Sequence, residues 1–184
     1  RHEVHLLRNQ FDAILVGAKT VIVDDPKLTV RDIENSRNPV RVILDINLIT
    51  SPDAEVYKQA EATKVYLVTK IRQDKKKIDA FLKVNSNLEL IEVPEISNSR
   101  LDLKVLFSVL AEKNILSVLV EAGPSLSSEL ISNQLIDEYV LFIAPKLLGE
   151  QNSINNLNVK NANFEFKIID HRLIGNDLMI ILRK

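Results

Sequence analysis

Two repeating patterns of apolar residues divide this chain of 184 residues into predicted elements. Short apolar runs bounded by turn residues predict buried strands at 12–16, 40–45, 64–69, 88–93 and 118–120. Apolar residues at helical spacing predict helices at 1–10, 73–83 and 101–114. Within 73–83, this spacing predicts that Ile78 and Leu82 face the core.

Between the first two strands the pattern is weaker. Residues 18–23 show no clear preference, and Asp24-Asp25-Pro26 predicts a loop after them. We expect 28–31 to be extended and 32–38 to form a polar surface loop.

The C-terminal third predicts adjacent strands. A long strand is expected at 136–148, where Pro145 interrupts it, followed by a polar loop at 149–163. Two alternating runs, 164–173 and 178–182, predict a hairpin around a Gly-Asn turn. Strands that alternate with helices and end in adjacent strands predict an α/β fold with a mostly parallel sheet and an antiparallel edge. We expect one domain over 1–184.

The stretch from Val118 to Glu129 is the most distinctive junction in the chain. Its apolar run reaches Glu121, turns at Gly123-Pro124 and continues as a serine-rich segment. Pro124 predicts a first helical turn that the serines can cap. A helix that starts beyond a strand's carboxyl end favours phosphate groups, so Glu121 would lie beside a ligand. The alternative is an ordinary strand–helix junction with a buried, paired glutamate.

Composition narrows the function classes. The net charge of −1 gives no reason to expect a nucleic acid or an anionic membrane as partner. No apolar run reaches the roughly 18 residues that a membrane-spanning helix needs. The absence of cysteine excludes disulfides, thiolate metal sites and cysteine nucleophiles, and it suits a reducing compartment such as the cytoplasm.

Common catalytic motifs are absent from the sequence. It has no G-x-S-x-G elbow, no G-x-G-x-x-G loop and no Walker lysine loop. His2 and His5 are expected to be exposed helix residues, because no zinc-binding pattern accompanies them. The Lys75 to Lys77 cluster is expected to be a solvated helix face.

Two further features join the Glu121 junction as candidates. The first is the segment from Thr20 to Arg31, with Asp24-Asp25-Pro26 and Leu28 inside it, whose alternative is an Asp-Pro turn with a surface arginine. The second is Arg8, whose alternative is a solvated helix residue. None of these features names a reaction by itself.

Together, these segments resemble the reductase domain of riboflavin biosynthesis. The resemblance rests on four blocks in the same order: DAILVGAKTVIVDDPKLTVR at 12–31, NPVRVILD at 38–45, VLVEAGPSL at 118–126 and IDEYVLFIAPKLLG at 136–149. It implies a dihydrofolate-reductase-like fold, a homodimer and NADPH-dependent reduction of 5-amino-6-(5-phosphoribosylamino)uracil to its ribitylamino product.

The resemblance also implies site residues. Cofactor contacts are implied for Thr20, Asp24, Gly123, Pro124, Ser125, Leu126, Ser127, Ser128 and Glu129. Substrate contacts are implied for Arg8, Leu28, Arg31 and Glu121, and Glu121 is the candidate for protonating or polarising the opening ribose. No metal is expected.

This chain departs from the reductase pattern in two ways and also lacks a motif of the neighbouring deaminase domain. It opens at Arg1, after the family's first strand and loop, and its only methionine is Met179, so we expect a fragment of a longer protein. Ile46 stands where many relatives have a serine suited to the 2′-phosphate of NADPH. The zinc motif of the deaminase domain that often precedes this reductase is also absent from the sequence. Two alternatives stay open: a reductase for the non-deaminated diaminopyrimidinone, and a non-catalytic domain for dimerisation or ligand binding.

Overall fold

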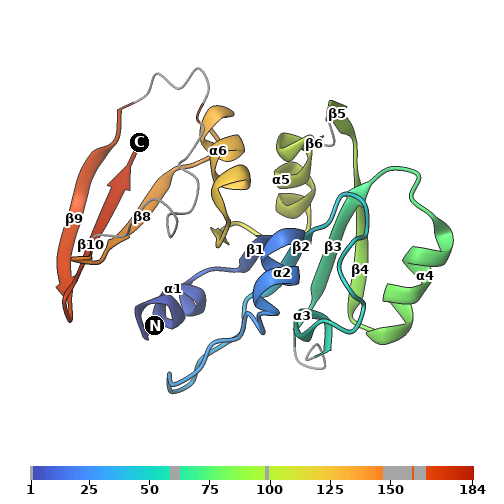
Figure 1. The fold of residues 1–184 in the computed structure, drawn as a ribbon, viewed down its shortest axis with the longest axis horizontal. Coiled ribbons are helices and arrows are strands. Elements are labelled where there is room, and N and C mark those ends of the chain that lie inside the picture. The colour runs from blue at the N-terminus through green and yellow to red at the C-terminus, as the bar shows by residue number, and fades with distance from the viewer. Residues whose placement is uncertain (1, 59–62, 98–99, 147–158, 160–164) are drawn as a thin grey trace. The chain divides into compact units, whose positions relative to one another are not determined.

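The computed structural model describes residues 2–58, 63–97, 100–146, 159 and 165–184 (Figure 1). The chain separates into two compact units, Arg1–Gly123 and Pro124–Lys184, and each is described here by itself.

The first unit contains a parallel sheet of five strands in the order β4-β3-β2-β1-β7. The strands are β1 (Ala13–Gly17), β2 (Val40–Leu44), β3 (Val65–Lys70), β4 (Leu88–Val93) and β7 (Val118–Val120). β1, β2 and β3 are apolar along almost their whole length and buried, as expected for strands covered on both faces. All five strands were predicted from the sequence. β7, however, lies at the edge of this sheet and is only half-buried.

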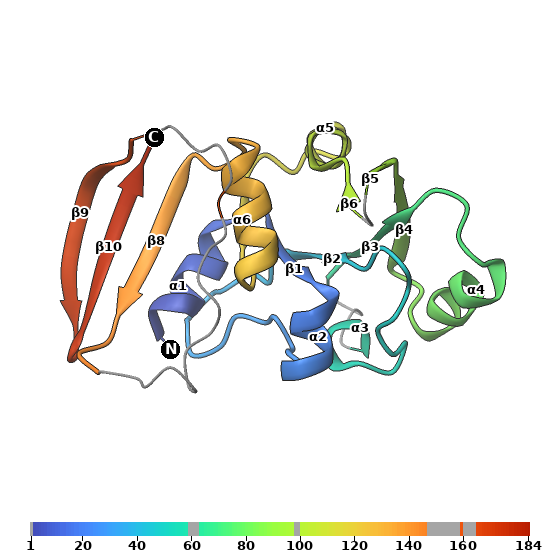
Figure 2. The same ribbon diagram turned by 45° about the horizontal axis from the view of Figure 1, so that its top comes forward.

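Helices cover both faces of this sheet (Figure 2). The helices of this unit are α1 (His2–Gln10), α2 (Ala18–Asp24), α3 (Glu55–Lys58), α4 (Lys75–Val84) and α5 (Leu103–Glu112). α2, α3 and α4 lie on one face, where Val21, Tyr57 and Phe81 join a buried cluster with alternate residues of the strands. α5 lies on the other face and buries Leu106 and Leu110.

The sequence pattern left residues 18–23 unassigned, and two expectations in this unit were wrong. Residues 18–24 form α2, although their propensities are weak, because Val21 is buried in the core. In α4, Ile78 packs against the core as predicted, but Leu82 is 43% exposed and Phe81 is the buried residue instead. The stretch expected to be extended at 28–31 is not extended at Leu28, which has φ of 52° and a side chain that is only 2% exposed.

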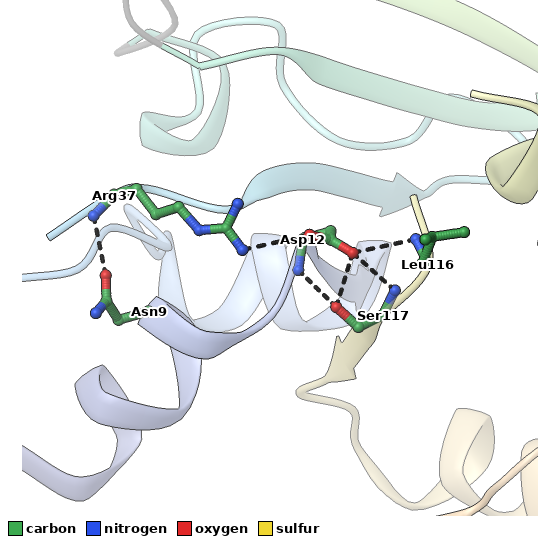
Figure 3. Close-up of polar contacts among 5 residues, drawn as sticks. All are labelled: Asn9, Asp12, Arg37, Leu116 and Ser117. Atoms are coloured by element: carbon green, nitrogen blue, oxygen red, sulfur yellow. Dashed lines mark hydrogen bonds and ion pairs between the residues drawn. The ribbon is translucent and has the colours of Figure 1, made fainter. Parts of the chain in front are cut away.

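Asp12 fastens β1 to β7 where both strands begin (Figure 3). Its Oδ2 accepts hydrogen bonds from the backbone N–H of Leu116 at 3.1 Å and of Ser117 at 3.0 Å, and from the Ser117 hydroxyl at 2.9 Å. The Asp12 N–H donates back to that hydroxyl oxygen at 2.9 Å. The Ser117 hydroxyl and these N–H groups, with Arg37, hold the pKa of Asp12 below its usual range, although partial burial opposes them. This network fixes the β1–β7 register, in which Leu15 pairs with Val120.

The second unit contains a helix and an antiparallel sheet. α6 (Pro124–Ser132) begins at the predicted proline, so its serines lie within the helix and Gly123 precedes it. The strands β8 (Glu138–Ile143), β9 (Lys167–Ile174) and β10 (Asp177–Arg183) form a sheet in the order β8-β10-β9.

The predicted hairpin is confirmed. β9 and β10 pair around Gly175, whose φ of 61° suits glycine in a tight turn. β8 ends before Pro145, and it pairs with β10, so the three strands form their own sheet among the described residues. The loop expected at 149–163 lies almost wholly outside the described residues.

Two small strands, β5 (Glu95–Ser97) and β6 (Arg100–Leu101), were not predicted and pair with each other. Within the described ranges, no helix combines the length and apolar character that crossing a membrane requires.

Candidate active site

The order of the strands reverses beside β1. From β1 the chain adds β2, β3 and β4 on one side, and it returns to add β7 on the other. In open parallel sheets, ligands bind outside the carboxyl ends of the strands at such a reversal. Gly17 ends β1, and Glu121 directly follows β7, where its N–H donates to the Leu15 carbonyl at 3.0 Å. The topology therefore puts Glu121 at the edge where a ligand is expected.

Glu121 forms a forked ion pair with Arg8 of α1. Nε and Nη2 of Arg8 donate to Oε1 and Oε2 of Glu121, each at 2.7 Å. Two parallel charge-assisted hydrogen bonds fix both side chains more firmly than a single contact does. The side chains are 12% exposed for Arg8 and 27% for Glu121, so the carboxylate is shielded but still reachable. Arg8 is therefore not a solvated helix residue.

The third nitrogen of Arg8 binds the loop that follows α2. Nη1 donates to the Thr29 carbonyl at 3.1 Å, and Nδ1 of His5 lies 3.2 Å from the same oxygen. Residues from three distant segments thus converge, and we call His5, Arg8, Thr29 and Glu121 the Arg8 cluster.

His5 was expected to be an exposed helix residue, and that expectation was wrong, because the structure half-buries it. A carbonyl oxygen only accepts, so Nδ1 of His5 must carry the proton that binds Thr29. Partial burial lowers the pKa of His5, and the charges of Arg8 and Arg31 lower it further, against the opposing effects of the Thr29 carbonyl and Asp32. One signal was available in the sequence: His5 precedes Arg8 by three residues, which is one helix face.

The other predicted substrate residues lie on the same loop. Arg31 is exposed, and its charge acts on His5, so it belongs to the surroundings of the Arg8 cluster. The Leu28 side chain is part of the buried core, so a ligand contact at this position would use its backbone. Substrate binding by both residues remains a prediction.

The predicted cofactor residues Thr20 and Asp24 lie on α2, which follows β1 directly. Thr20 is half-buried, and Asp24, at the last position of the helix, is exposed. The neighbouring Asp25 caps the helix with φ of 39° and accepts the Glu55 N–H at 2.8 Å. Thr20 thus lies near the ligand edge of the sheet, whereas Asp24 is at the far end of its helix.

The predicted turn at Gly123-Pro124 falls on the boundary of the two units, with Gly123 at the end of the first and Pro124 at the start of the second. Gly123 is exposed, and a Cβ built there would meet nothing within 4 Å, so open space adjoins this backbone. The remaining predicted cofactor residues are in α6 of the second unit, where Ser125 is exposed and Leu126 and Ser128 are buried. Cofactor binding by Pro124, Ser125, Leu126, Ser127, Ser128 and Glu129 remains a prediction.

The end of β2 contributes Asp45 and Ile46 to the same edge of the sheet. Asp45 is fully buried, and its carboxylate accepts the N–H groups of Ile49 and Thr50 at 2.9 and 2.8 Å and the Thr50 hydroxyl at 2.7 Å. The Ile46 carbonyl accepts hydrogen bonds from the hydroxyl of Thr69 and the side-chain amide of Gln73. Because isoleucine has no polar side-chain atom, position 46 offers no side-chain donor for a phosphate.

Comparison with known proteins decides the family. The sequence profile of the RibD C-terminal domain matches residues 1–180. The chain belongs to the RibD C-terminal domain family. The RibD protein of Aquifex aeolicus is 32% identical over 186 residues, which cover 100% of this chain and 49% of that protein. This RibD-type chain therefore spans about half the length of the RibD relatives it matches.

A second relative is shorter. The 2,5-diamino-6-ribosylamino-4(3H)-pyrimidinone 5′-phosphate reductase of Archaeoglobus fulgidus is 31% identical over 159 residues, covering 82% of this chain and 69% of that protein. RibD-related chains thus include a protein named as a reductase alone.

Solved structures confirm the fold. Acinetobacter baumannii RibD superposes with a TM-score of 0.76 at 30% identity, covering 100% of this chain and 49% of that one. A Thermotoga maritima protein described as a deaminase and 5-amino-6-(5-phosphoribosylamino)uracil reductase gives 0.74 at 28% identity, covering 100% and 48%. The predicted α/β fold with a mostly parallel sheet and a C-terminal hairpin is therefore confirmed.

The residues at the sheet reversal suit a nicotinamide dinucleotide. Its pyrophosphate needs a close approach to backbone, and the open space beside Gly123 permits one. Thr20 adds a hydroxyl on the helix after β1. Among the residues that the structure describes, no group of three or more His, Cys, Asp or Glu side chains could hold a metal ion.

Proposed function

We propose that this chain is the reductase of riboflavin biosynthesis that uses NADPH to convert 5-amino-6-(5-phosphoribosylamino)uracil into its ribitylamino product. The observation that carries the proposal is the forked Arg8–Glu121 pair at the sheet reversal, in a chain of the RibD C-terminal domain family. The names of the Thermotoga and Archaeoglobus relatives support reduction of a phosphoribosylated pyrimidine.

The proposed cofactor contacts lie on α2 and in the segment that begins at Gly123. We assign Thr20, Asp24 and the segment from Gly123 to Glu129 to this role, which the glycine turn and the helix start at Pro124 support. NADPH, when bound, supplies a hydride, while the protein contributes position and electrostatics.

Glu121 would hold and polarise the sugar. Opening the ribose breaks the bond between C1′ and the ring oxygen, so C1′ gains a hydride and the oxygen gains a proton. Each Glu121 oxygen accepts one N–H from Arg8, which leaves lone pairs for a hydroxyl or amine of the substrate. Arg8 fixes the carboxylate for this contact, and Glu121 is our candidate for directing the proton to the ring oxygen.

The substrate phosphate calls for a cation. Arg31 is exposed and lies on the loop that the Arg8 cluster binds through Thr29, so its guanidinium is available for a forked phosphate contact. Arg8 already donates three hydrogen bonds within the protein and would add at most its remaining N–H groups. A backbone contact at Leu28 would complete the substrate site.

The direct test is NADPH oxidation in the presence of the deaminated substrate, with the protein as it is naturally encoded. We expect turnover, with the ribitylamino product identified by mass spectrometry. An absence of both turnover and NADPH binding would overturn the proposal. Calorimetry with NADPH, combined with the turnover assay, tests the alternative of a non-catalytic dimerisation or ligand-binding domain. Binding of NADPH without turnover would support that alternative.

A second candidate substrate is the diaminopyrimidinone that has not been deaminated. The name of the Archaeoglobus relative, at 31% identity, favours it. Specificity is the ratio of kcat/KM for the two substrates. A ratio in favour of the diaminopyrimidinone would assign the chain to reduction before deamination.

Cofactor preference needs its own measurement, because Ile46 lacks the hydroxyl that would bind a 2′-phosphate. We propose NADPH as the physiological cofactor. The kcat/KM values for NADPH and NADH test this, and a preference for NADH would replace NADPH in the proposal.

We also propose that residues 1–184 act as one reductase domain in a homodimer, with a deaminase domain in the same protein. The greater length of the RibD relatives supports the deaminase domain. Exposed apolar residues on two strands of the second unit support the dimer, among them Phe142, Ile168 and Leu173. Sedimentation of the naturally encoded protein tests the dimer, and a monomer at micromolar concentration would contradict it.

A further inference from the structure

The polar face of α1 fastens both ends of one loop. His5 and Arg8 meet at the Thr29 carbonyl, with Nδ1 and Nη1 at 3.2 and 3.1 Å from that oxygen. One residue further along the helix, Asn9 accepts the N–H of Arg37 at 2.9 Å. Because His5, Arg8 and Asn9 share one helix face, α1 binds the loop where it begins and where it ends.

The loop between these contacts holds an unfavourable backbone. Asp32 and Asn35 have φ of 60° and 52°, and Leu28, just before the loop, has φ of 52°. Such values are strained for leucine and less so for Asp and Asn, so contacts with the surroundings help to hold this backbone. Inside the loop, the Val30 N–H donates to Asn38 at 2.8 Å, but most other loop residues are exposed. The contacts with α1 are thus a main restraint on the loop that carries Arg31.

We propose that His5 is a positioning residue, which donates from Nδ1 to the Thr29 carbonyl and so holds Arg31 where the substrate phosphate binds. This inference rests on the proposed function, because Arg31 is assigned there to the phosphate. It goes beyond that function by giving a role to a residue that the proposed function leaves without one. The half-buried, neutral imidazole fits this role, since the nearby Arg8 and Arg31 disfavour a second positive charge.

Three substitutions at this position separate its two ring nitrogens. The amide nitrogen of asparagine takes the place of Nδ1, whereas that of glutamine takes the place of Nε2. We expect His5→Ala and His5→Gln to raise KM for the phosphorylated substrate about three- to tenfold, the value of one hydrogen bond, with kcat changed by less than about twofold. His5→Asn should restore the wild-type KM. His2→Asn, at an exposed position of the same helix, is the control and should change nothing.

A readout without substrate keeps this inference separate from the proposed function. Hydrogen exchange of the Val30 and Arg31 amides should accelerate in His5→Ala and His5→Gln and return to the wild-type rate in His5→Asn. If the wild type lacks turnover but shows this exchange pattern, the proposed function fails and the restraint on the loop stands. If the wild type turns over and neither KM nor exchange changes in His5→Ala, the role of His5 is overturned. A defect that His5→Asn does not restore overturns it as well.

Discussion

Glu121 joins segments that are far apart in the sequence. Its carboxylate binds Arg8, 113 positions away, and Arg8 in turn binds Thr29. A charge pair of this kind costs desolvation, and forked geometry offsets that cost. At the residue scale, the site is therefore a set of mutually fixed polar groups rather than one reactive side chain.

Replacing Glu121 tests its catalytic role. Glu121→Gln keeps the shape but removes the negative charge, so we expect kcat to fall on the order of 10²-fold, as for other groups that assist proton transfer. The folded state should survive, with a loss of about 1–3 kcal/mol, because one acceptor remains for Arg8. Steady-state kinetics and chemical denaturation measure the two effects. Glu112→Gln, at an exposed position of α5, is the control. Unchanged kinetics in Glu121→Gln would return Glu121 to a purely structural role.

Replacing Arg31 should affect substrate binding rather than the catalytic step. Arg31→Ala should raise KM for the phosphorylated substrate by about ten- to a hundredfold, the value of a charged hydrogen bond, with little change in kcat. An unphosphorylated analogue should show no such difference between variant and wild type. Lys83→Ala removes another exposed cation as the control. An equal effect on both substrates would remove the phosphate assignment.

At the scale of elements, the beginning and the end of β7 have separate tasks. Asp12 fixes its beginning against β1, as Figure 3 shows, and Glu121 follows its end. Because the contacts of Asp12 set the register of β7 against β1, Glu121 lies opposite the end of β1. A strand of three residues needs such an anchor, since its own ladder is short.

The anchor makes a prediction about pH. The pKa of Asp12 is lowered by folding, so its contribution to stability is full above the ordinary aspartate value and is lost as pH falls through the lowered one. Asp12→Asn should therefore cost about 1–3 kcal/mol at pH 7 and progressively less below about pH 4. Denaturation at several pH values measures this, with the exposed Asp79→Asn as control. A cost that stays constant down to pH 2 would contradict an ionic anchor.

The two turns offer a matched glycine pair. Gly123→Ala adds a methyl group into open space, so stability should be unchanged while the Kd for NADPH rises if the cofactor approaches there. Gly175→Ala should have the opposite effects. Because Gly175 has φ of 61°, alanine there should lower the free energy of unfolding by about 1 kcal/mol, while the Kd for NADPH should stay unchanged. Chemical denaturation measures the stability of both variants, and calorimetry measures their Kd for NADPH. Normal NADPH binding by Gly123→Ala would move the cofactor away from this turn.

At the scale of the whole molecule, the length of the chain and its lack of cysteine bear on the deaminase activity. It spans about half of its RibD relatives, and it contains no cysteine for a zinc deaminase centre. We expect residues 1–184 by themselves to release no ammonia from the diaminopyrimidine substrate, with or without added zinc. An ammonia assay measures this, and zinc-dependent release would show a deaminase site of another kind.

The sequence by itself determined the five strands of the parallel sheet, the main helices, the hairpin and the family. These follow from local periodicity and from contiguous motifs, such as the run that ends at Glu121, and such signals are carried by neighbouring residues. It did not determine α2, whose weak propensities yield to the burial of Val21, nor the choice of Phe81 over Leu82 on α4.

Only the tertiary structure decided how the site is assembled. The reversal of strand order beside β1, the Arg8–Glu121 pair and the meeting of His5 with Thr29 join residues distant in the chain. No periodicity encodes such partners, because each depends on where the sheet brings two separate segments together. The sequence named Glu121 as a candidate, and the fold gave it Arg8 as its partner and the carboxyl edge of the sheet as its location.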